Sequence, residues 1–203
     1  MLLEKPERER GLKKERIIRV LLNHPEEDIT KYRVAKLADV SEPWCREYTE
    51  RLQEKDLLKD TKVIKPNGLY REWKNIRISP NQLTVALQKP MQLLENIELG
   101  YALTTYQAEN LKQGLLFPST TDFYVKEEEI EDWIQLIKER GSLGGGNTRL
   151  RATDQHVFYK QEEIEGYNIV STPQLILDLL EEEGPCKEAA RKLIDKFHGE
   201  EHG

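Results

Sequence analysis

The chain has 203 residues, of which 37% are hydrophobic and 33% are charged, with a formal net charge of −6. No apolar run approaches the ~20 residues that a bilayer requires, so the composition excludes a membrane-spanning protein and is typical of a globular one. The two cysteines and the charged N-terminal sequence predict a cytoplasmic protein with neither a disulfide framework nor a signal peptide.

The charge is distributed unevenly along the chain. Residues 1–80 contain 19 Lys and Arg against 15 Asp and Glu, whereas residues 81–203 contain 12 against 22. Such asymmetry indicates two domains with different partners, because a mildly basic half can face phosphates and an acidic half suits a basic protein surface. The turn-forming residues Ser79-Pro80-Asn81 predict the boundary between these domains.

Three helices are expected in the first sixty residues. Apolar residues at helical spacing predict the first helix from Leu12 to Asn23, which His24-Pro25 ends. Thr30 and Ser41 are suitable N-caps for a second and a third helix, joined by a tight turn that Val40 closes.

A two-stranded ribbon, closed by Pro66-Asn67-Gly68, is expected after the third helix. From Lys59 to Arg77 this segment carries six basic residues and two acidic ones. Helix, turn, helix and ribbon in this order, from Ile29 to Trp73, predict a winged helix-turn-helix. The predominant use of such a unit is docking on double-stranded DNA.

Residues 12–77 resemble the winged helix-turn-helix superfamily of prokaryotic transcription regulators. The matching residues are Ala35, Val40-Ser41, Leu52 and Leu57-Leu58. Asp56 stands where family members usually have Gly, and Glu47 stands where many have Arg.

The third helix is expected to read bases. Arg46 could donate two hydrogen bonds to guanine, and Trp44 could contact a thymine methyl group. Phosphate contacts are expected from basic residues of the second helix and the ribbon. These residues are Lys31, Arg33, Lys62, Lys65 and Arg71. Two alternatives stay open: Trp44 could brace the turn as a core aromatic residue, and the ribbon lysines could protect an edge strand.

Three carboxylates of the third helix oppose base readout. Glu42, Glu47 and Glu50 could accept hydrogen bonds only from cytosine and are repelled by phosphates. They favour an alternative use of the unit, which is the binding of a protein partner.

The second half is expected to be a mixed α/β domain over residues 81–203, so the predicted fold class is α+β. Periodicity and turn residues predict strands at Tyr101–Leu103, Asp122–Lys126, Arg149–Thr153, His156–Lys160 and Tyr167–Val170. Helices are predicted around Leu83–Leu87 and Met91–Ile97, from Thr104 or Thr105 to Gly114, over Glu127–Arg140, from a capping box at Ser171–Gln174 to Gly184, and around Ala190–Phe197.

About 100 residues of this half resemble the C-terminal domain of AbiEi-type antitoxins, the regulators of type IV toxin–antitoxin loci. The matching segments are Tyr101-Ala102-Leu103-Thr104 with Ala108, and Val170-Ser171-Thr172-Pro173 with Leu177-Asp178-Leu179-Leu180. Gln174-Leu175 stands where the family usually has Glu-Arg. The family also places a winged helix-turn-helix first. The resemblance implies repression of the protein's own operon, with a toxin as a possible partner.

No catalytic or metal site is predicted. Gly144-Gly145-Gly146 lies between a helix and a strand, whereas a phosphate-binding loop lies between a strand and a helix. Asp122, Asp154 and Lys160 do not have the spacing of a nuclease site, and the four histidines have no ligand spacing with the cysteines.

The sequence therefore predicts a DNA-binding transcriptional regulator of the AbiEi-like kind without a cofactor or enzymatic activity. A homodimer is expected, because one winged helix buries too little surface for useful specificity. The alternative is a protein-interaction module. An enzyme of nucleic-acid metabolism, the third class considered, lacks a visible site.

Overall fold

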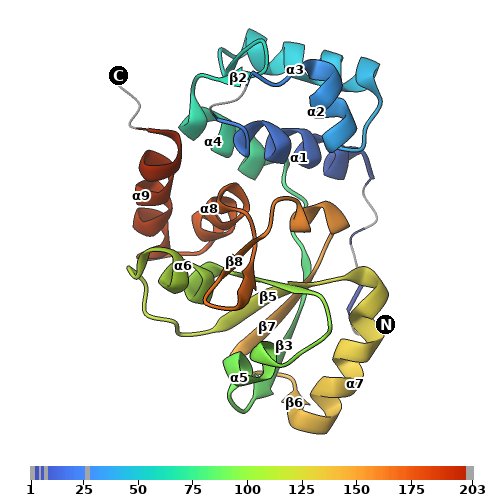
Figure 1. Ribbon diagram of the computed structural model, residues 1–203, viewed down its shortest axis with the longest axis vertical. Helices are drawn as coiled ribbons and strands as arrows, with labels where there is room; N and C mark the ends of the chain where they lie inside the picture. Colours follow the sequence, from blue (N-terminus) through green and yellow to red (C-terminus); the bar gives the residue numbers. More distant parts are fainter. Residues whose placement is uncertain (1–2, 5, 7–8, 26–27, 200–203) are drawn as a thin grey trace.

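The computed structural model describes residues 3–4, 6, 9–25 and 28–199 of the chain. A helical unit with a small hairpin precedes a mixed sheet that is surrounded by helices (Figure 1). The helical unit contains α1 (Glu9–Leu22), α2 (Lys31–Leu37), α3 (Glu42–Glu54), β1 (Leu58–Lys59), β2 (Lys62–Val63) and α4 (Pro66–Ile76). The remainder contains β3 (Asn81–Leu87), α5 (Pro90–Glu95), β4 (Tyr101–Thr104), α6 (Thr105–Gln113), β5 (Thr121–Val125), η1 (Glu127–Glu129), α7 (Ile130–Arg140), β6 (Gly141–Leu143), β7 (Thr148–Ala152), η2 (Gln155–Phe158), β8 (Glu162–Ile164), β9 (Tyr167–Ile169), α8 (Thr172–Glu181) and α9 (Cys186–His198).

Helices α2 and α3 stand where the sequence predicts them. The side chain of Thr30 accepts a hydrogen bond from the backbone N–H of Arg33 and so caps α2. Asp39 has a left-handed φ of 52° in the short turn that leads to α3. Ser41 is the N-cap residue of α3, as predicted, but its side chain makes no capping hydrogen bond with a described residue.

The segment after α3 differs from the predicted ribbon. β1 and β2 are two residues long and pair antiparallel around Asp60-Thr61. Pro66-Asn67-Gly68 opens α4, which buries Leu69, Tyr70 and Trp73. The ribbon prediction is therefore wrong over this segment, because proline suits the first turn of a helix and the apolar residues recur at helical spacing.

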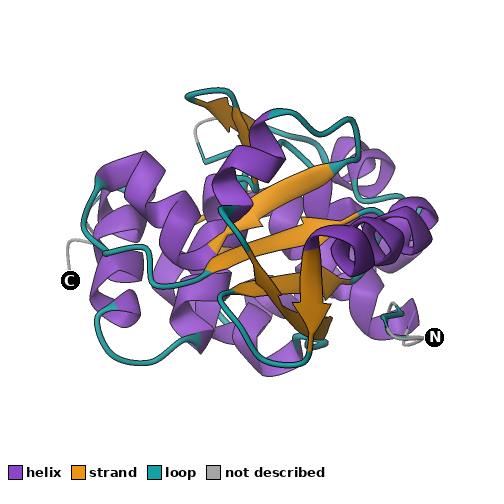
Figure 2. Cartoon of the chain, turned by 90° about the horizontal axis from the view of Figure 1, so that it is seen from below, coloured by secondary structure: helices purple, strands orange, loops and turns teal. Residues whose placement is uncertain are grey.

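Seven strands form a mixed sheet in the order β6-β3-β7-β5-β4-β9-β8, with parallel pairing only between β5 and β7 and between β4 and β9 among the described strands. Helices lie on both sides of the sheet (Figure 2). Successive side chains of a strand point to opposite faces. Phe123 of β5 thus packs on Trp133 of α7, with ring centroids 5.0 Å apart, whereas Asp122 and Tyr124 face α6 and α8.

Two predicted elements of the second half are wrong. The segment around Leu83–Leu87 is strand β3 and not a helix, because β6 and β7 pair with it on both sides and satisfy its backbone. The segment His156–Lys160 is not a strand beside β7. The carboxylate of Asp154 accepts a hydrogen bond from the backbone N–H of His156 and starts the 3-10 turn η2 instead.

Helix α8 lies at the centre of the packing. Every residue from Thr172 to Leu179 is buried. The helix packs against α1 and α4 of the helical unit and against α6 and α9. The capping box predicted at its start does not form, because Gln174 is bonded to Arg19 and Asp178. Buried residues from both halves of the chain join in one hydrophobic core through this helix.

Gly146 passes close to the backbone of β3. A Cβ at this position would lie 2.5 Å from the amide nitrogen of Ala86, whereas a Cβ at Gly145 would meet nothing within 4 Å.

We expect Gly146→Ala to lower the free energy of unfolding by about 2 kcal/mol or more, because β3 must shift. Gly145→Ala should cost about 1 kcal/mol, because only its positive φ of 79° is strained. Urea denaturation measures both losses, and equal losses would contradict the close approach.

Candidate functional site

The exposed ridge of α3 is acidic. Helical periodicity places Pro43, Glu47, Glu50 and Glu54 opposite the buried face, and all four residues are exposed. Figure 1 shows α3 at the end of the molecule that lies away from the sheet. The ridge therefore offers carboxylates to solvent at the positions where a helix in the major groove would meet bases.

Arg46 and Arg51, on the flanks of this ridge, are each bonded to a carboxylate of the same helix. The guanidinium of Arg46 lies 3.0 Å from Glu42, and Arg51 is paired with Glu47. Arg46 is exposed, as the prediction of base readout requires. Glu42 engages one of the five N–H donors of this guanidinium, so a guanine would compete with the carboxylate for the arginine.

Trp44 lies in a groove between α1 and α3, which Glu47 of the acidic ridge borders. Its side chain is half-buried against the core and stacks on Tyr48, with ring centroids 5.8 Å apart. The groove also contains Gly11, Lys13 and Lys14 of α1. This placement favours the alternative in which Trp44 braces the helical unit over direct contact with a thymine methyl group.

The five residues expected to bind phosphate differ in their surroundings. Lys31 is half-buried and lies 3.7 Å from Asp60 and 3.9 Å from Glu50, so its charge is largely satisfied within the unit. The other four are exposed and have no ion-pair partner in the described part of the chain. They are Arg33, Lys62, Lys65 and Arg71.

The fold brings some of these residues together. Lys31 links α2 to α3 and to the hairpin turn, so Arg33 of α2 and Lys62 of β2 belong to one contiguous part of the unit. Lys59 stands directly opposite Lys62 in the hairpin and extends the basic surface. Arg71 lies instead on α4, which packs on α1, α8 and α9.

The sequence did not point to two further exposed residues of α2 as candidates for binding. Tyr32 has 61% of its surface exposed, and Lys36 is exposed without an ion-pair partner among the described residues. Both lie opposite the buried Val34 and Ala35. The helical spacing of Tyr32 and Lys36 relative to the apolar residues Val34 and Ala35 could have predicted that both side chains face solvent.

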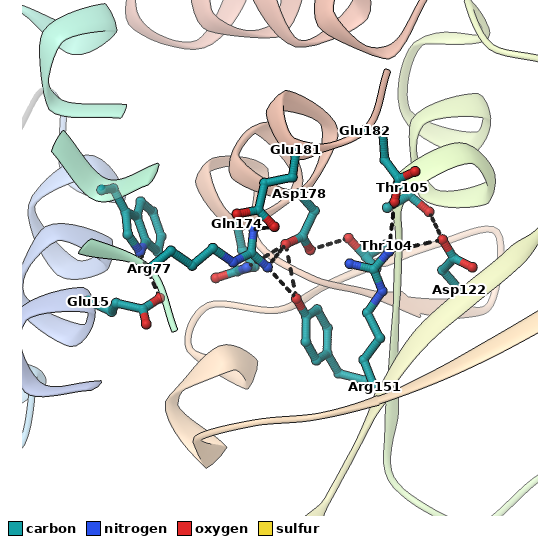
Figure 3. Close-up of polar contacts among 12 residues, drawn as sticks. Glu15, Arg77, Thr104, Thr105, Asp122, Arg151, Gln174, Asp178, Glu181 and Glu182 are labelled. Carbon is teal, nitrogen blue, oxygen red and sulfur yellow. Dashed lines mark hydrogen bonds and ion pairs between the residues drawn. The ribbon is translucent and has the colours of Figure 1, made fainter. Parts of the chain in front are cut away.

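A buried ionic cluster lies beneath the helical unit, where the chain passes from α4 into the sheet (Figure 3). Asp178 of α8 accepts hydrogen bonds from Arg77 at 2.5 Å and from the hydroxyl of Tyr124 at 3.0 Å. Thr104 and Gln174 donate to the same carboxylate. Three segments distant in the sequence therefore converge on one buried charge of α8.

Asp122 of β5 forms the second half of the cluster. Arg149 donates to this carboxylate at 2.7 Å, and Arg151 and Thr105 donate to it as well. Glu182 accepts from both arginines, at 2.8 and 3.0 Å. The pattern Arg-x-Arg in a buried strand places both guanidinium groups on one face of the sheet, and this alternation was the signal in the sequence.

Burial and neighbouring charges shift the pKa values of the carboxyl groups in the cluster in opposite directions. Burial disfavours the ionised form of Asp178, but the positive charges of Arg77 and Arg151 outweigh this effect and hold its pKa below the usual range. Burial raises the pKa of Glu181, which lies 3.1 Å from Arg77. A carboxylate with a lowered pKa is a poor proton donor near neutral pH, so the cluster has the character of a structural clamp.

Further polar contacts hold the helical unit on the sheet. Arg16 of α1 donates to Asp154 at 2.6 Å, and Arg19 donates to Gln174 at 2.9 Å. Arg19 also donates to Nδ1 of His156 at 3.0 Å, so Nε2 carries the proton and donates to the carbonyl of Leu37 at 2.9 Å. Together with the ionic cluster, these contacts fix one orientation of the unit.

The three residues weighed for a nuclease are each bonded to a different partner. Asp122 is bonded to Arg149, Asp154 is bonded to Arg16, and Lys160 donates to the backbone carbonyl of Asn23. Within the described ranges, no three His, Cys, Asp or Glu side chains are placed to hold a metal ion.

No protein-family model, curated protein or solved structure matches this chain. In the part of the chain that the structure describes, no helix combines the length and the apolar character needed to cross a membrane.

Asp178→Ala should strongly destabilise the protein. The substitution leaves Arg77 and Arg151 buried with less compensating charge, and breaking a buried pair in this way costs about 3–5 kcal/mol. Glu188→Ala, which removes an exposed partner of Lys192, should cost less than about 1 kcal/mol. Urea denaturation compares the variants, and similar losses would contradict the role assigned to the cluster.

His156 should make stability depend on pH. Burial and the charge of Arg19 lower its pKa from 6.5 to about 4. The unfolded chain therefore binds more protons between these values, and stability falls as the pH drops below about 6.5. We expect a loss of about 2 kcal/mol from this residue between pH 7 and pH 5.

His156→Gln provides the comparison, because its amide can replace both hydrogen bonds of the imidazole and does not titrate. Urea denaturation at the two pH values should show a smaller loss in the variant. An equal loss in both proteins would contradict the assignment.

Proposed function

We propose that the chain is a DNA-binding transcriptional regulator that docks on double-stranded DNA through α2 and the hairpin. One observation carries the proposal. Exposed basic residues gather on α2 and around the hairpin, beside the short turn that joins α2 to α3, and they have no ion-pair partner in the described chain. These residues are Arg33, Lys36, Lys59, Lys62 and Lys65. Autorepression, with control of a toxin partner, is the part of the proposal that the AbiEi-like resemblance supplies.

Phosphate contacts should dominate the binding. Arg33 and Lys62 have no carboxylate to release among the described residues, so their charges are available to DNA phosphates. Each such contact releases condensed counterions and makes the affinity depend on salt. Lys31 should contribute less than the sequence suggested, because Glu50 and Asp60 already lie near its ammonium group.

The acidic ridge of α3 should limit base readout. Glu47, Glu50 and Glu54 disfavour deep insertion into a major groove, because they face phosphates and base acceptors with negative charge. The sequence preference of one protomer should therefore be modest. A symmetric dimer on two half-sites would multiply it, as in other regulators of this type.

Fluorescence anisotropy with the duplex from upstream of the protein's own gene, and with a scrambled duplex, tests the proposal at two salt concentrations. Lys62→Ala/Lys65→Ala should weaken binding to both duplexes about tenfold or more, and should lower the salt slope by about 2. The matched control is Lys138→Ala/Lys187→Ala, which removes two exposed lysines from α7 and α9. Absence of binding at low salt, or equal effects of the two double variants, would overturn the proposal.

A second candidate is a module that binds a basic protein partner, and the acidic ridge of α3 favours it. Replacing Glu47, Glu50 and Glu54 with Gln distinguishes the two functions. The triple variant should bind DNA more tightly if the unit docks on DNA, because phosphate repulsion falls. It should lose a co-purifying basic partner if the ridge is the binding surface.

A further inference from the structure

The groove between α1 and α3 is a distinct feature of the helical unit. It consists of two depressions of about 610 and 310 Å³ that share Trp44. The larger one lies against the turn between α2 and α3 and contains Lys13 and Lys36. The smaller one contains Lys14 and Tyr48. These volumes fall in the range of small-molecule sites.

The charges of the groove are positive on balance. Its two acidic residues are already paired, Asp39 with Arg16 at 2.9 Å and Glu47 with Arg51. Lys13 and Lys36 are exposed and have no ion-pair partner within the described ranges. Their ammonium groups can therefore hold an anionic group that enters the larger depression.

Trp44 supplies a flat apolar wall beside these lysines. Its ring is stacked on Tyr48 on one side, with an interplanar angle of 24°, and is only half-buried. The Nζ atom of Lys14 lies 5.7 Å from the centroid of the Tyr48 ring, so this cation is directed to the aromatic pair. An aromatic surface next to free ammonium groups fits a ligand that has a planar ring and an anionic group.

We infer that the groove between α1 and α3 binds a small organic phosphate with a planar aromatic ring, the chemistry of a nucleotide. The ring stacks on Trp44, and the phosphates contact Lys13 and Lys36. The site shares Lys36 with the surface proposed for DNA, whereas Lys13 and Trp44 belong to the groove alone, so the binding of the ligand is measured without DNA. Because Lys36 lies on α2 and Trp44 on α3, an occupant bridges the two helices that present that surface.

The intrinsic fluorescence of Trp44 provides a direct test. Trp73 and Trp133 are fully buried, so a ligand in the groove changes the signal of Trp44 above all. Titration with ADP at low salt, followed by fluorescence and by calorimetry, should give saturable quenching. Adenosine and pyrophosphate, which each lack one half of the recognised chemistry, should bind at least about tenfold more weakly.

Lys13→Ala/Lys36→Ala should weaken ADP binding about tenfold or more, whereas Lys138→Ala/Lys187→Ala should leave it unchanged. All four lysines are exposed, so both double variants should fold, and circular dichroism verifies this. Trp44→Phe should abolish the quenching.

Three results would overturn the inference. The first is the absence of quenching and heat with millimolar ADP. The second is an equal affinity for pyrophosphate and ADP, which would indicate a simple anion site. The third is that Lys13→Ala/Lys36→Ala weakens duplex DNA binding while the unsubstituted protein does not bind ADP, which would assign both lysines to DNA.

Discussion

The contact between Arg77 and Asp178 is the interaction on which the arrangement of this protein depends. Both side chains are at least 97% buried, and they join the end of the helical unit to the central helix α8. An isolated buried charge is costly, so each side chain requires the other in place, together with the hydroxyl of Tyr124 and the amide of Gln174. The pair thereby selects one orientation of the helical unit over the alternatives that an apolar contact alone would allow.

This orientation determines which surfaces are available for binding. α1 and α4 pack against α8. α2, α3 and the hairpin lie at the end of the molecule that is farthest from the sheet. Their exposed charges are divided: α3 presents carboxylates, and α2 and the hairpin present basic groups without partners in the described chain. A surface divided in this way favours contacts with phosphates along a DNA backbone over insertion of α3 into the major groove. The groove beside Trp44 shares Lys36 with this basic surface, so a small ligand bound there would contact the same two helices.

The sequence predicted local elements better than the contacts between segments that lie far apart in the chain. The capping residue Thr30, the apolar periodicity of α7 and the terminating Gly114 of α6 act within a few residues, and the corresponding predictions are confirmed. β3 was expected to be helical because its strand partners, β6 and β7, come more than fifty residues later in the chain. The ionic cluster was missed for the same reason, since Arg77 and Asp178 are 101 residues apart and no local pattern pairs them, although Asp178 lies in a segment of the family resemblance. The exposure of Arg33, Lys62, Lys65 and Arg71 agrees with their expected role in binding phosphate.

Amide hydrogen exchange of the intact protein, with and without a saturating duplex from upstream of its own gene, tests the central claim most directly. The account predicts that DNA slows exchange in residues 31–36 and 58–65, with smaller changes along the outer turns of α3. Saturating DNA that leaves both of these segments unchanged, or that protects the outer turns of α3 most strongly, would contradict the claim that α2 and the hairpin hold the DNA backbone.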